Sequence, residues 1–299
     1  MERKATAVDD VDILSPAKIN LFLEVIARRP DGYHEIESVM QLVDLCDRVH
    51  LARTPRGIQV DVTGAELPSG PGNLAYQAAI RLMEGTGLRD GIRILLEKRI
   101  PVAGGLGGGS SNAAAVLAGM NRLYDLGYTR EALQEIGAAL GSDVPFFLSE
   151  GLALASGRGE QLFDLAPWPP FWLVVANPGE PVSTAWAYQE ASSKLTEWQP
   201  RSSIRSLVVK NQLPWPPSWV FNRLEAVVLP HRAALRHLKS LLEEGGGFPV
   251  LMSGSGASFF AVVPDDQSAQ TLAARAHAVG AFAAAVRTLV KNPILTATA

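Results

Sequence analysis

The sequence has few of the features that mark secreted, zinc-binding or membrane-spanning proteins. Its single cysteine, Cys46, excludes an internal disulfide bond and favours a reducing compartment, so we expect the protein in the cytoplasm. The five histidines form no H-E-x-x-H or similar spacing, so we predict no structural zinc, and we assign no side chain as a metal ligand. The longest apolar runs, such as residues 278–286, are too short to cross a bilayer.

The chain also lacks an excess of charge of one sign. Its 299 residues carry a formal net charge of -3, and 47% of them are hydrophobic. This composition is typical of a globular protein with two domains, and it offers no basic surface to nucleic acid or to a membrane. Residues 1–12 are polar and charged, which argues against a signal peptide. We expect a small-molecule partner and a monomer or homodimer.

The common phosphate-binding motifs are missing too, since the sequence has no Gly-Lys dipeptide and no G-x-G-x-x-G. Residues 101–112 instead read Pro-Val-Ala-Gly-Gly-Leu-Gly-Gly-Gly-Ser-Ser-Asn, and an alanine-rich stretch follows. Glycine lets successive backbone N–H groups point toward one ligand. A helix that begins at Ser110 or Ser111 adds unpaired N–H groups and the positive end of its dipole at the same place. Such a loop is suited to bind a phosphate. A flexible linker is the alternative, but linkers rarely lead from an apolar strand into a strong helix former.

A Pro-Trp-Pro-Pro run at residues 167–170 suggests a boundary between two domains, residues 1–165 and 166–299. Each half reads as an α+β sandwich with a mixed or antiparallel sheet. Strands are predicted at 17–25, 39–45, 58–62, 92–96, 152–155, 171–176, 250–252, 259–263 and 281–289. Helices are predicted at 74–83 with Asn73 as the cap, after the glycine loop to 124, from a Thr129 cap to 140, at 220–242 with a break near Pro230, and at 267–278. A loop is predicted at 213–219.

Three other segments carry unusual polar residues. Lys18 and Asn20 lie two apart, so on a strand they share one face. Tyr33 and His34 follow an Asp-Gly turn signal. Asp143 lies between a helix end and an apolar run. Alone, each has an ordinary explanation: a solvated lysine, a surface hairpin, or a turn aspartate.

Together, these pieces suit phosphoryl transfer. The glycine loop and Mg²⁺ would hold a triphosphate, Asp143 would accept or orient the acceptor's hydroxyl proton, and Lys18 would stabilise the ionised aspartate or the developing charge.

The glycine loop resembles the P-x-x-x-G-L-x-S-S signature of the GHMP kinase superfamily, with added glycines before the serines. Segments 16–21, 29–34, 141–147, 157–160 and 252–256 resemble one branch of it, whose members phosphorylate a cytidine-diphosphate-linked methylerythritol in non-mevalonate isoprenoid synthesis. The likeness covers nearly the whole chain. Pro-Ala-Lys-x-Asn combined with Asp-Gly-Tyr-His is highly specific for this branch. Two departures are Ser142, where the branch usually has Ala, and Asn222-Arg223-Leu224-Glu225, where it usually has Asn-Asp-x-Glu.

The resemblance implies a two-domain GHMP kinase fold, with an N-terminal domain like the second domain of ribosomal protein S5 and a ferredoxin-like C-terminal α/β sandwich. It implies ATP and Mg²⁺ as cofactors, Asp143 as catalytic base and Lys18 as its partner. It places ATP against Pro101, Gly104, Gly105, Leu106, Gly107, Gly108, Gly109, Ser110, Ser111, Asn73 and Lys98.

For the acceptor, the resemblance implies binding by Asn20, Tyr33, His34 and Tyr188. His34 would read the edge of the cytosine base and Tyr188 would stack on it, with Trp186 as the alternative stacking residue. Two other readings stay open at this point. The chain could be a different GHMP enzyme, such as a homoserine kinase, or a nucleotide-binding regulatory protein without turnover. The presence of both Lys18 and Asp143 argues against the second.

Overall fold

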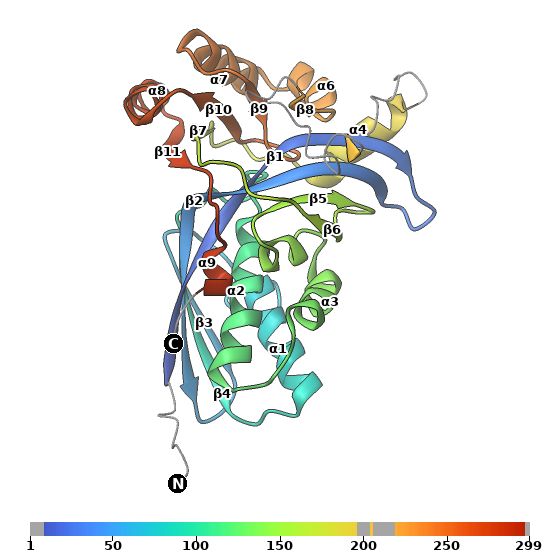
Figure 1. Cartoon of the computed structure of the whole chain (residues 1–299), viewed down its shortest axis with the longest axis vertical. Coiled ribbons are helices and arrows are strands. Elements are labelled where there is room, and N and C mark those ends of the chain that lie inside the picture. Colours follow the sequence, from blue (N-terminus) through green and yellow to red (C-terminus); the bar gives the residue numbers. More distant parts are fainter. Residues whose placement is uncertain (1–8, 196–203, 206–218, 297–299) are drawn as a thin grey trace.

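The computed structural model of the chain describes residues 9–195, 204–205 and 219–296. Two β-sheets with flanking helices make up the molecule, which confirms the predicted α+β class (Figure 1). Within these ranges, no helix combines the length and the apolar character that a bilayer crossing needs.

The larger sheet has seven strands and belongs mainly to the first half of the chain. Its order is β3-β4-β2-β1-β8, and β5 pairs with β2 and β6. The strands are β1 (Asp10–Arg28), β2 (His34–Thr54), β3 (Ile58–Thr63), β4 (Gly91–Glu97), β5 (Leu152–Ser156), β6 (Gln161–Asp164) and β8 (Phe221–Asn222).

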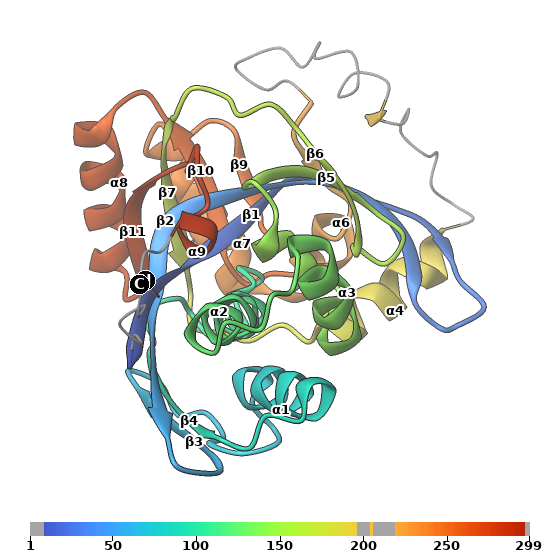
Figure 2. The same ribbon diagram turned by 60° about the horizontal axis from the view of Figure 1, so that its bottom comes forward.

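Strands β1 and β2 form a hairpin much longer than predicted, of 19 and 21 residues. The start of β1 alternates buried and exposed residues, as a strand covered on one face should, and its middle is buried throughout. The predicted segments 17–25 and 39–45 lie inside these strands, where residues 17–25 and 39–43 are buried without interruption. The hairpin extends from the region of β3 and β4 to the opposite side of the molecule (Figure 2).

Three helices cover one face of this sheet: α1 (Leu74–Thr86), α2 (Gly108–Leu123) and α3 (Arg130–Leu140). The two predicted caps are confirmed, because Asn73 accepts from the N–H of Ala75 and Thr129 from the N–H of Ala132. Helix α2 begins earlier than predicted, at Gly108, with Gly107 as its cap residue. The first helical turn therefore lies inside the glycine loop itself.

The second sheet is antiparallel, with the order β11-β7-β10-β9. Its strands are β7 (Trp172–Asn177), β9 (Val250–Met252), β10 (Phe259–Val263) and β11 (Phe282–Arg287). The remaining described elements are η1 (Pro145–Leu148), α4 (Thr184–Lys194), α6 (Glu225–Val228), η2 (Leu229–His231), α7 (Ala233–Glu244), α8 (Asp266–Ala278) and α9 (Pro293–Thr296).

Two elements show where local sequence signals fail. The prediction of helix at 220–222 was wrong: these residues include β8, which pairs in parallel with Phe22 and Leu23 of β1. That pairing is tertiary and leaves no local signal. Helix α4 was not predicted, because it buries only Ala187 and Ala191 and has weak hydrophobic periodicity.

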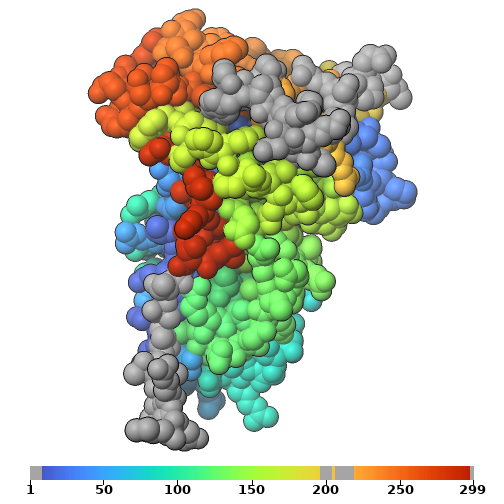
Figure 3. All heavy atoms as spheres, viewed as in Figure 1, coloured from blue at the N-terminus to red at the C-terminus, as the bar shows by residue number. Residues whose placement is uncertain are grey.

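The two halves are interleaved rather than simply joined. The predicted boundary near residue 166 falls between β6 and β7, yet β8 returns to the first sheet and helix α9 packs on the first half (Figure 3). There Asn292 donates to the carbonyls of Phe147 and Ser149, both at 2.8 Å, and Ile294 is fully buried. Most of the predicted loop at 213–219 lies outside the described residues, and the boundary at 166 stays a prediction.

Candidate active site

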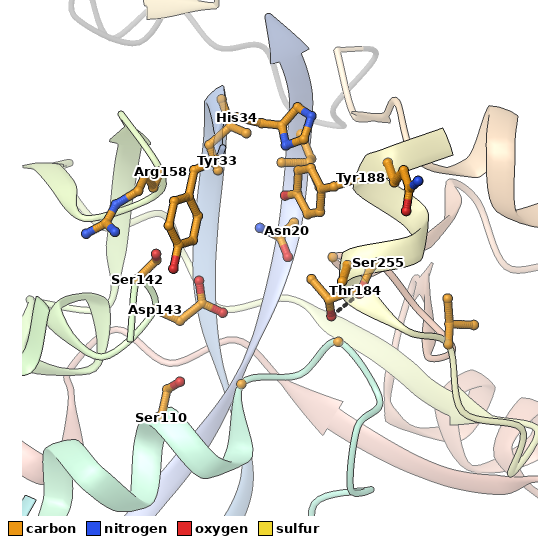
Figure 4. A pocket seen from close by; sticks show the side chains of 18 of the residues that line it. Asn20, Tyr33, His34, Ser110, Ser142, Asp143, Arg158, Thr184, Tyr188 and Ser255 are labelled. Carbon is orange, nitrogen blue, oxygen red and sulfur yellow. Dashed lines mark hydrogen bonds between the residues drawn. The ribbon is translucent and has the colours of Figure 1, made fainter. Parts of the chain in front are cut away.

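A cleft of about 1030 Å³ opens where the two halves meet, and both halves line it (Figure 4). This volume is at the upper end of the range for small-molecule sites. The first half contributes β1, the turn between β1 and β2, the glycine loop and the turn before η1. The second half contributes α4 and the loop after β9. The predicted site residues that line the cleft are Lys18, Asn20, Tyr33, His34, Gly105, Gly107, Ser110, Asp143 and Tyr188.

The glycine loop forms one wall of the cleft. Gly105 and Gly107 have positive φ of 75° and 72°, a backbone region that favours glycine. The first helical hydrogen bond of α2 runs from the N–H of Ser111 to the carbonyl of Gly107, at 2.9 Å. The N–H groups that precede it have no partner inside the helix, and the positive end of the helix dipole lies with them. The wall is therefore suited to bind phosphate oxygens.

Packing explains several of these glycines better than ligand binding does. A Cβ at Gly104 would lie 2.7 Å from Ser258 Oγ, and one at Gly105 would lie 2.1 Å from the carbonyl oxygen of Ser253. The loop after β9 thus lies directly against the glycine loop. Ser253 Oγ donates to the Gly105 carbonyl at 2.9 Å, and the Ser258 N–H donates to the Gly104 carbonyl at 3.0 Å.

Two further glycines behave differently from each other. A Cβ at Gly107 would lie 2.6 Å from the ring of Phe147. At Gly109 the nearest atom is Leu74 Cδ1 at 3.7 Å, an ordinary contact. Internal packing therefore excludes a side chain at Gly107 but leaves room for one at Gly109.

Lys18 and Asp143 come together across the cleft. Lys18 Nζ lies 3.6 Å from Asp143 Oδ2, and the lysine side chain is 5% exposed while that of the aspartate is 37% exposed. Lys18 Nζ also donates to Asn20 Oδ1 at 2.6 Å, as expected for two residues that share one face of β1. The Asn20 amide in turn donates to Ser38 Oγ at 2.8 Å, and the Ser38 hydroxyl donates to the Phe22 carbonyl. This chain of bonds fixes the lysine and the amide beside the open carboxylate.

The cleft is electropositive. Its lining includes the cationic residues Lys18, Arg28 and Arg158 and one carboxylate, Asp143. A highly charged anion fits such a lining, while a cationic ligand does not. Arg158 lies on the loop between β5 and β6, and its guanidinium lies 4.7 Å from the ring centre of Tyr33.

The far end of the cleft is aromatic. Tyr33 and Tyr188 lie on opposite sides of the space, with the tip of Tyr33 directed toward Ser142 and Asp143 (Figure 4). The ring of His34 lies 5.2 Å from that of Tyr188, inclined by 35°. Tyr33 is 53% exposed, so its ring is available to a ligand.

Two titratable groups at this end, His34 and Tyr188, have pKa values shifted in the direction that favours the neutral form. Burial, and to a lesser degree the charge of Arg28, lowers the pKa of His34. Its Nε2 is hydrogen-bonded to the hydroxyl of Ser192, which leaves Nδ1 for a ligand. Burial of the Tyr188 hydroxyl, together with the negative charge of Asp143, raises the pKa of that phenol far above its ordinary value. The surface is therefore one of neutral rings, suited to a neutral base.

Six predicted residues of the glycine loop do not line the cleft themselves: Pro101, Gly104, Leu106, Gly108, Gly109 and Ser111. Three predicted residues outside the loop lie elsewhere. Trp186 packs edge-on against His231, with 5.7 Å between ring centres, and does not line the cleft. Asn73 caps α1 and donates to the carbonyl of Pro68, while Lys98 is buried in an ion pair with Asp47. The predicted contacts of Asn73 and Lys98 with ATP stay predictions. The Asn73 amide and the Lys98 ammonium already bind these partners, so either group would have to contact ATP in addition to them.

The sequence interpretation missed several residues of the cleft. Arg158 lies within the Gly157-x-Gly159-Glu160 match, which was a usable signal. Thr184 and Ser255 form a hydrogen bond of 2.9 Å across the opening, between α4 and the loop after β9. No local pattern marks this pair, since it depends on two segments that are far apart in the chain.

No group of three or more His, Cys, Asp or Glu residues that could hold a metal ion occurs in the part of the chain that the structure describes. The cleft offers one carboxylate, Asp143, and the nearby hydroxyl of Ser110. Mg²⁺ is commonly held by one or two carboxylates together with phosphate oxygens of the substrate. The residues present therefore fit a magnesium ion that arrives with a triphosphate.

Comparison with known proteins agrees with this geometry. Residues 73–151 match the GHMP kinases N terminal domain, and residues 204–281 match the GHMP kinases C terminal domain. A 4-diphosphocytidyl-2-C-methyl-D-erythritol kinase of Geobacter sp. (strain M21) is 45% identical over 282 residues, covering 93% of this chain and 99% of the relative.

Two solved structures are similar as well. A crystal structure of 4-(cytidine 5'-diphospho)-2C-methyl-D-erythritol kinase is 36% identical, with a TM-score of 0.78, and covers 93% of this chain and 98% of that one. The homoserine kinase of Cytophaga hutchinsonii has a TM-score of 0.70 at 18% identity and covers 98% of each chain; at that identity it shows the fold alone. The predicted two-domain GHMP kinase fold is confirmed.

Proposed function

This chain belongs to the 4-diphosphocytidyl-2-C-methyl-D-erythritol kinases of the GHMP kinase family, and from that premise we propose how its cleft performs the reaction. The enzyme transfers the γ-phosphoryl group of ATP to the 2-hydroxyl of 4-diphosphocytidyl-2-C-methyl-D-erythritol. The reaction is a step of non-mevalonate isoprenoid synthesis. The observation that carries the proposal is the position of Asp143, between the phosphate-binding wall and the aromatic end of one cleft.

Asp143 is the catalytic base. Its carboxylate is partly open to the cleft, where it can accept the proton of the acceptor hydroxyl as the oxygen bonds to the γ-phosphorus. The bond from that phosphorus to the β–γ bridging oxygen breaks, and its electron pair leaves with ADP. Lys18, held by Asn20, lies beside the carboxylate and stabilises negative charge on the transferred group.

The glycine loop holds the triphosphate. The N–H groups at the start of α2 and the Ser110 hydroxyl supply donors to the phosphate oxygens. Mg²⁺ is part of the nucleotide substrate and screens its charge when bound. Asp143 and Ser110 are the protein groups that fit beside it.

The aromatic end binds cytidine. A base between Tyr33 and Tyr188 gains stacking on both faces, which accepts any base, so discrimination must come from the base edge. The free nitrogen of neutral His34 supplies a hydrogen bond there. Arg28 and Arg158 are placed to attract the acceptor's diphosphate. We expect the enzyme in the cytoplasm, as a monomer or homodimer.

A panel of acceptors tests this function. ADP release would be measured with ATP, Mg²⁺ and, in turn, the cytidine-linked acceptor, its uridine-linked analogue, methylerythritol phosphate without a nucleotide, and homoserine. We expect the cytidine form to have by far the highest kcat/KM, because a buried group that pairs with cytosine is left unsatisfied by uracil. Equal values for the cytidine and uridine forms would contradict the cytidine site, and a preference for homoserine would contradict the assigned acceptor.

A further inference from the structure

A buried carboxylate, Asp47, lies beneath the glycine loop and has no part in the chemistry described so far. Asp47 is fully buried on strand β2, where it lies opposite Ser15 of β1. A carboxylate in that position is costly unless every lone pair has a donor. The donors of Asp47 come from the two chain segments that enter and leave the glycine loop.

The segment that enters the loop binds one carboxylate oxygen. Asp47 Oδ1 accepts the N–H of Arg99 at 2.7 Å and the N–H of Ile100 at 2.9 Å. These two residues follow β4 and directly precede Pro101, where the loop begins. The entry to the loop is therefore fixed through its backbone.

The segment that leaves the loop binds the other oxygen. Asp47 Oδ2 accepts the amide of Asn112 at 3.0 Å and is ion-paired with Lys98. Lys98 Nζ also donates to Asn112 Oδ1 at 2.8 Å, so lysine and carboxylate hold the two ends of the same amide. Asn112 lies in α2, just after the first turn that is proposed to bind phosphate.

A second layer ties this cluster to β1. The Asn112 amide donates to Ser15 Oγ at 2.9 Å, and the Ser15 and Ser111 hydroxyls are hydrogen-bonded at 2.7 Å. Lys98, Asn112, Ser15 and Ser111 are all buried. The side-chain partners of the carboxylate, Lys98 and Asn112, are thus themselves hydrogen-bonded, which leaves the cluster few ways to rearrange.

We propose that Asp47 is a positioning residue for ATP: it fastens the entry and the exit of the glycine loop to one buried carboxylate and so fixes the N–H groups that receive the phosphates. Five glycines between 104 and 109 give the loop few conformational preferences of its own, so contacts from outside must order its N–H groups. The loop after β9 holds Gly104 and Gly105, and Asp47 holds the two ends. Lys98 then acts on ATP through Asp47 and Asn112 and not by direct contact.

This inference rests on the proposed function, because it takes the glycine loop as the phosphate site. The test is therefore run first without acceptor. The neutral double variant Asp47→Asn with Lys98→Met avoids a stranded buried charge, and its affinity for a non-hydrolysable ATP analogue with Mg²⁺ would be measured by calorimetry. We expect the Kd to rise at least about tenfold. In turnover assays the KM for ATP should rise likewise, while the KM for the acceptor stays within about threefold of the parent value.

A matched control removes another buried ion pair. Arg223 binds Glu24 through two hydrogen bonds of 2.6 Å at the junction of β1 and β8, away from the glycine loop. The double variant Glu24→Gln with Arg223→Met should leave the Kd of the analogue near the parent value. If the Asp47 variant is too unstable to purify, Asn112→Leu replaces it, since that change keeps the ion pair of Asp47 with Lys98 and removes the hydrogen bonds of Asn112 to Asp47, Lys98 and Ser15.

Three results would overturn the proposal. They are an unchanged Kd for the analogue in the folded variant, an equal loss of affinity in the control, and a parallel rise of KM for both substrates. A parent enzyme that binds the analogue but does not phosphorylate the cytidine-linked acceptor would contradict the proposed function alone, and the comparison of Kd values would still test Asp47.

Discussion

Replacing Asp143 by Asn should lower the rate of phosphoryl transfer strongly and the stability of the fold only slightly. The amide keeps the size of the carboxylate but cannot accept the proton of the acceptor hydroxyl. Loss of a general base costs about 10²–10⁴-fold in rate, which corresponds to roughly 2.7–5.4 kcal/mol of activation free energy. The amide also stabilises the positive charge of Lys18 less than the carboxylate does, and this adds to the loss of rate.

The cost to the fold is much smaller. At 3.6 Å and an effective dielectric constant of about 20, the attraction between Lys18 and Asp143 is about 4–5 kcal/mol before desolvation and screening. The aspartate side chain is 37% exposed, so water screens much of this and the net contribution falls to about 1 kcal/mol or less. We therefore expect kcat to fall by about 10²–10⁴-fold while the melting temperature falls by no more than about 2–4 °C.

The assay is ADP release with ATP and the cytidine-linked acceptor, combined with calorimetry of ATP-analogue binding, whose Kd should stay within about threefold. Asp164→Asn is a matched control, because this carboxylate is 34% exposed and lies 3.9 Å from Arg130, outside the cleft. A kcat for Asp143→Asn within tenfold of the parent value would refute the assignment of Asp143 as base. An equal loss in the Asp164 variant would show that the effect is not specific.

Three further outcomes follow from the geometry of the cleft. Gly109→Val should leave the fold intact and weaken ATP-analogue binding at least about tenfold. Gly107→Val should weaken binding and also lower the melting temperature, because the new side chain would collide with the ring of Phe147. An equal loss of stability in both variants would contradict this. The KM for the acceptor should be constant above the ordinary histidine pKa of about 6.5 and rise only at lower pH, because His34 must be neutral to bind the base and its pKa is lowered. The stability of the fold should follow the same trend: the contribution of His34 is complete above about pH 6.5 and is lost as the pH falls through its lowered pKa. The His34→Gln variant should show neither the change in KM nor the change in stability. Tyr188→Ala should raise the acceptor's KM more than it lowers kcat, because stacking remote from the reacting hydroxyl holds ground state and transition state alike, and a fall in kcat alone would contradict this.

Local patterns predicted much of this molecule. The Asn73 and Thr129 caps and the short strands were visible because their signals lie within a few residues. Lys18 and Asn20 were placed on one face by strand periodicity, and their hydrogen bond confirms that arrangement. The pairing of Lys18 with Asp143 was inferred from what phosphoryl transfer requires and was implied again by the family resemblance, because no local pattern links two residues so far apart in the sequence.

The sequence could not predict features that depend on contacts between distant segments. The glycines at 104 and 105 were interpreted only as phosphate ligands, yet a Cβ at either would collide with the loop after β9. Strand β8 exists only because β1 is there to pair with it. The partner of Lys98 was also invisible, because Asp47 belongs to a different strand and meets it only in the folded sheet.

The most direct test of the account follows the transferred phosphate. Purified enzyme would be incubated with ATP, Mg²⁺ and 4-diphosphocytidyl-2-C-methyl-D-erythritol, and the products would be followed by ³¹P NMR together with mass spectrometry. The account predicts one new phosphomonoester on the 2-hydroxyl of the methylerythritol unit for each ADP formed, and no such product from the Asp143→Asn variant. ADP that accumulates without a phosphorylated acceptor, or a phosphate attached at another hydroxyl, would contradict it.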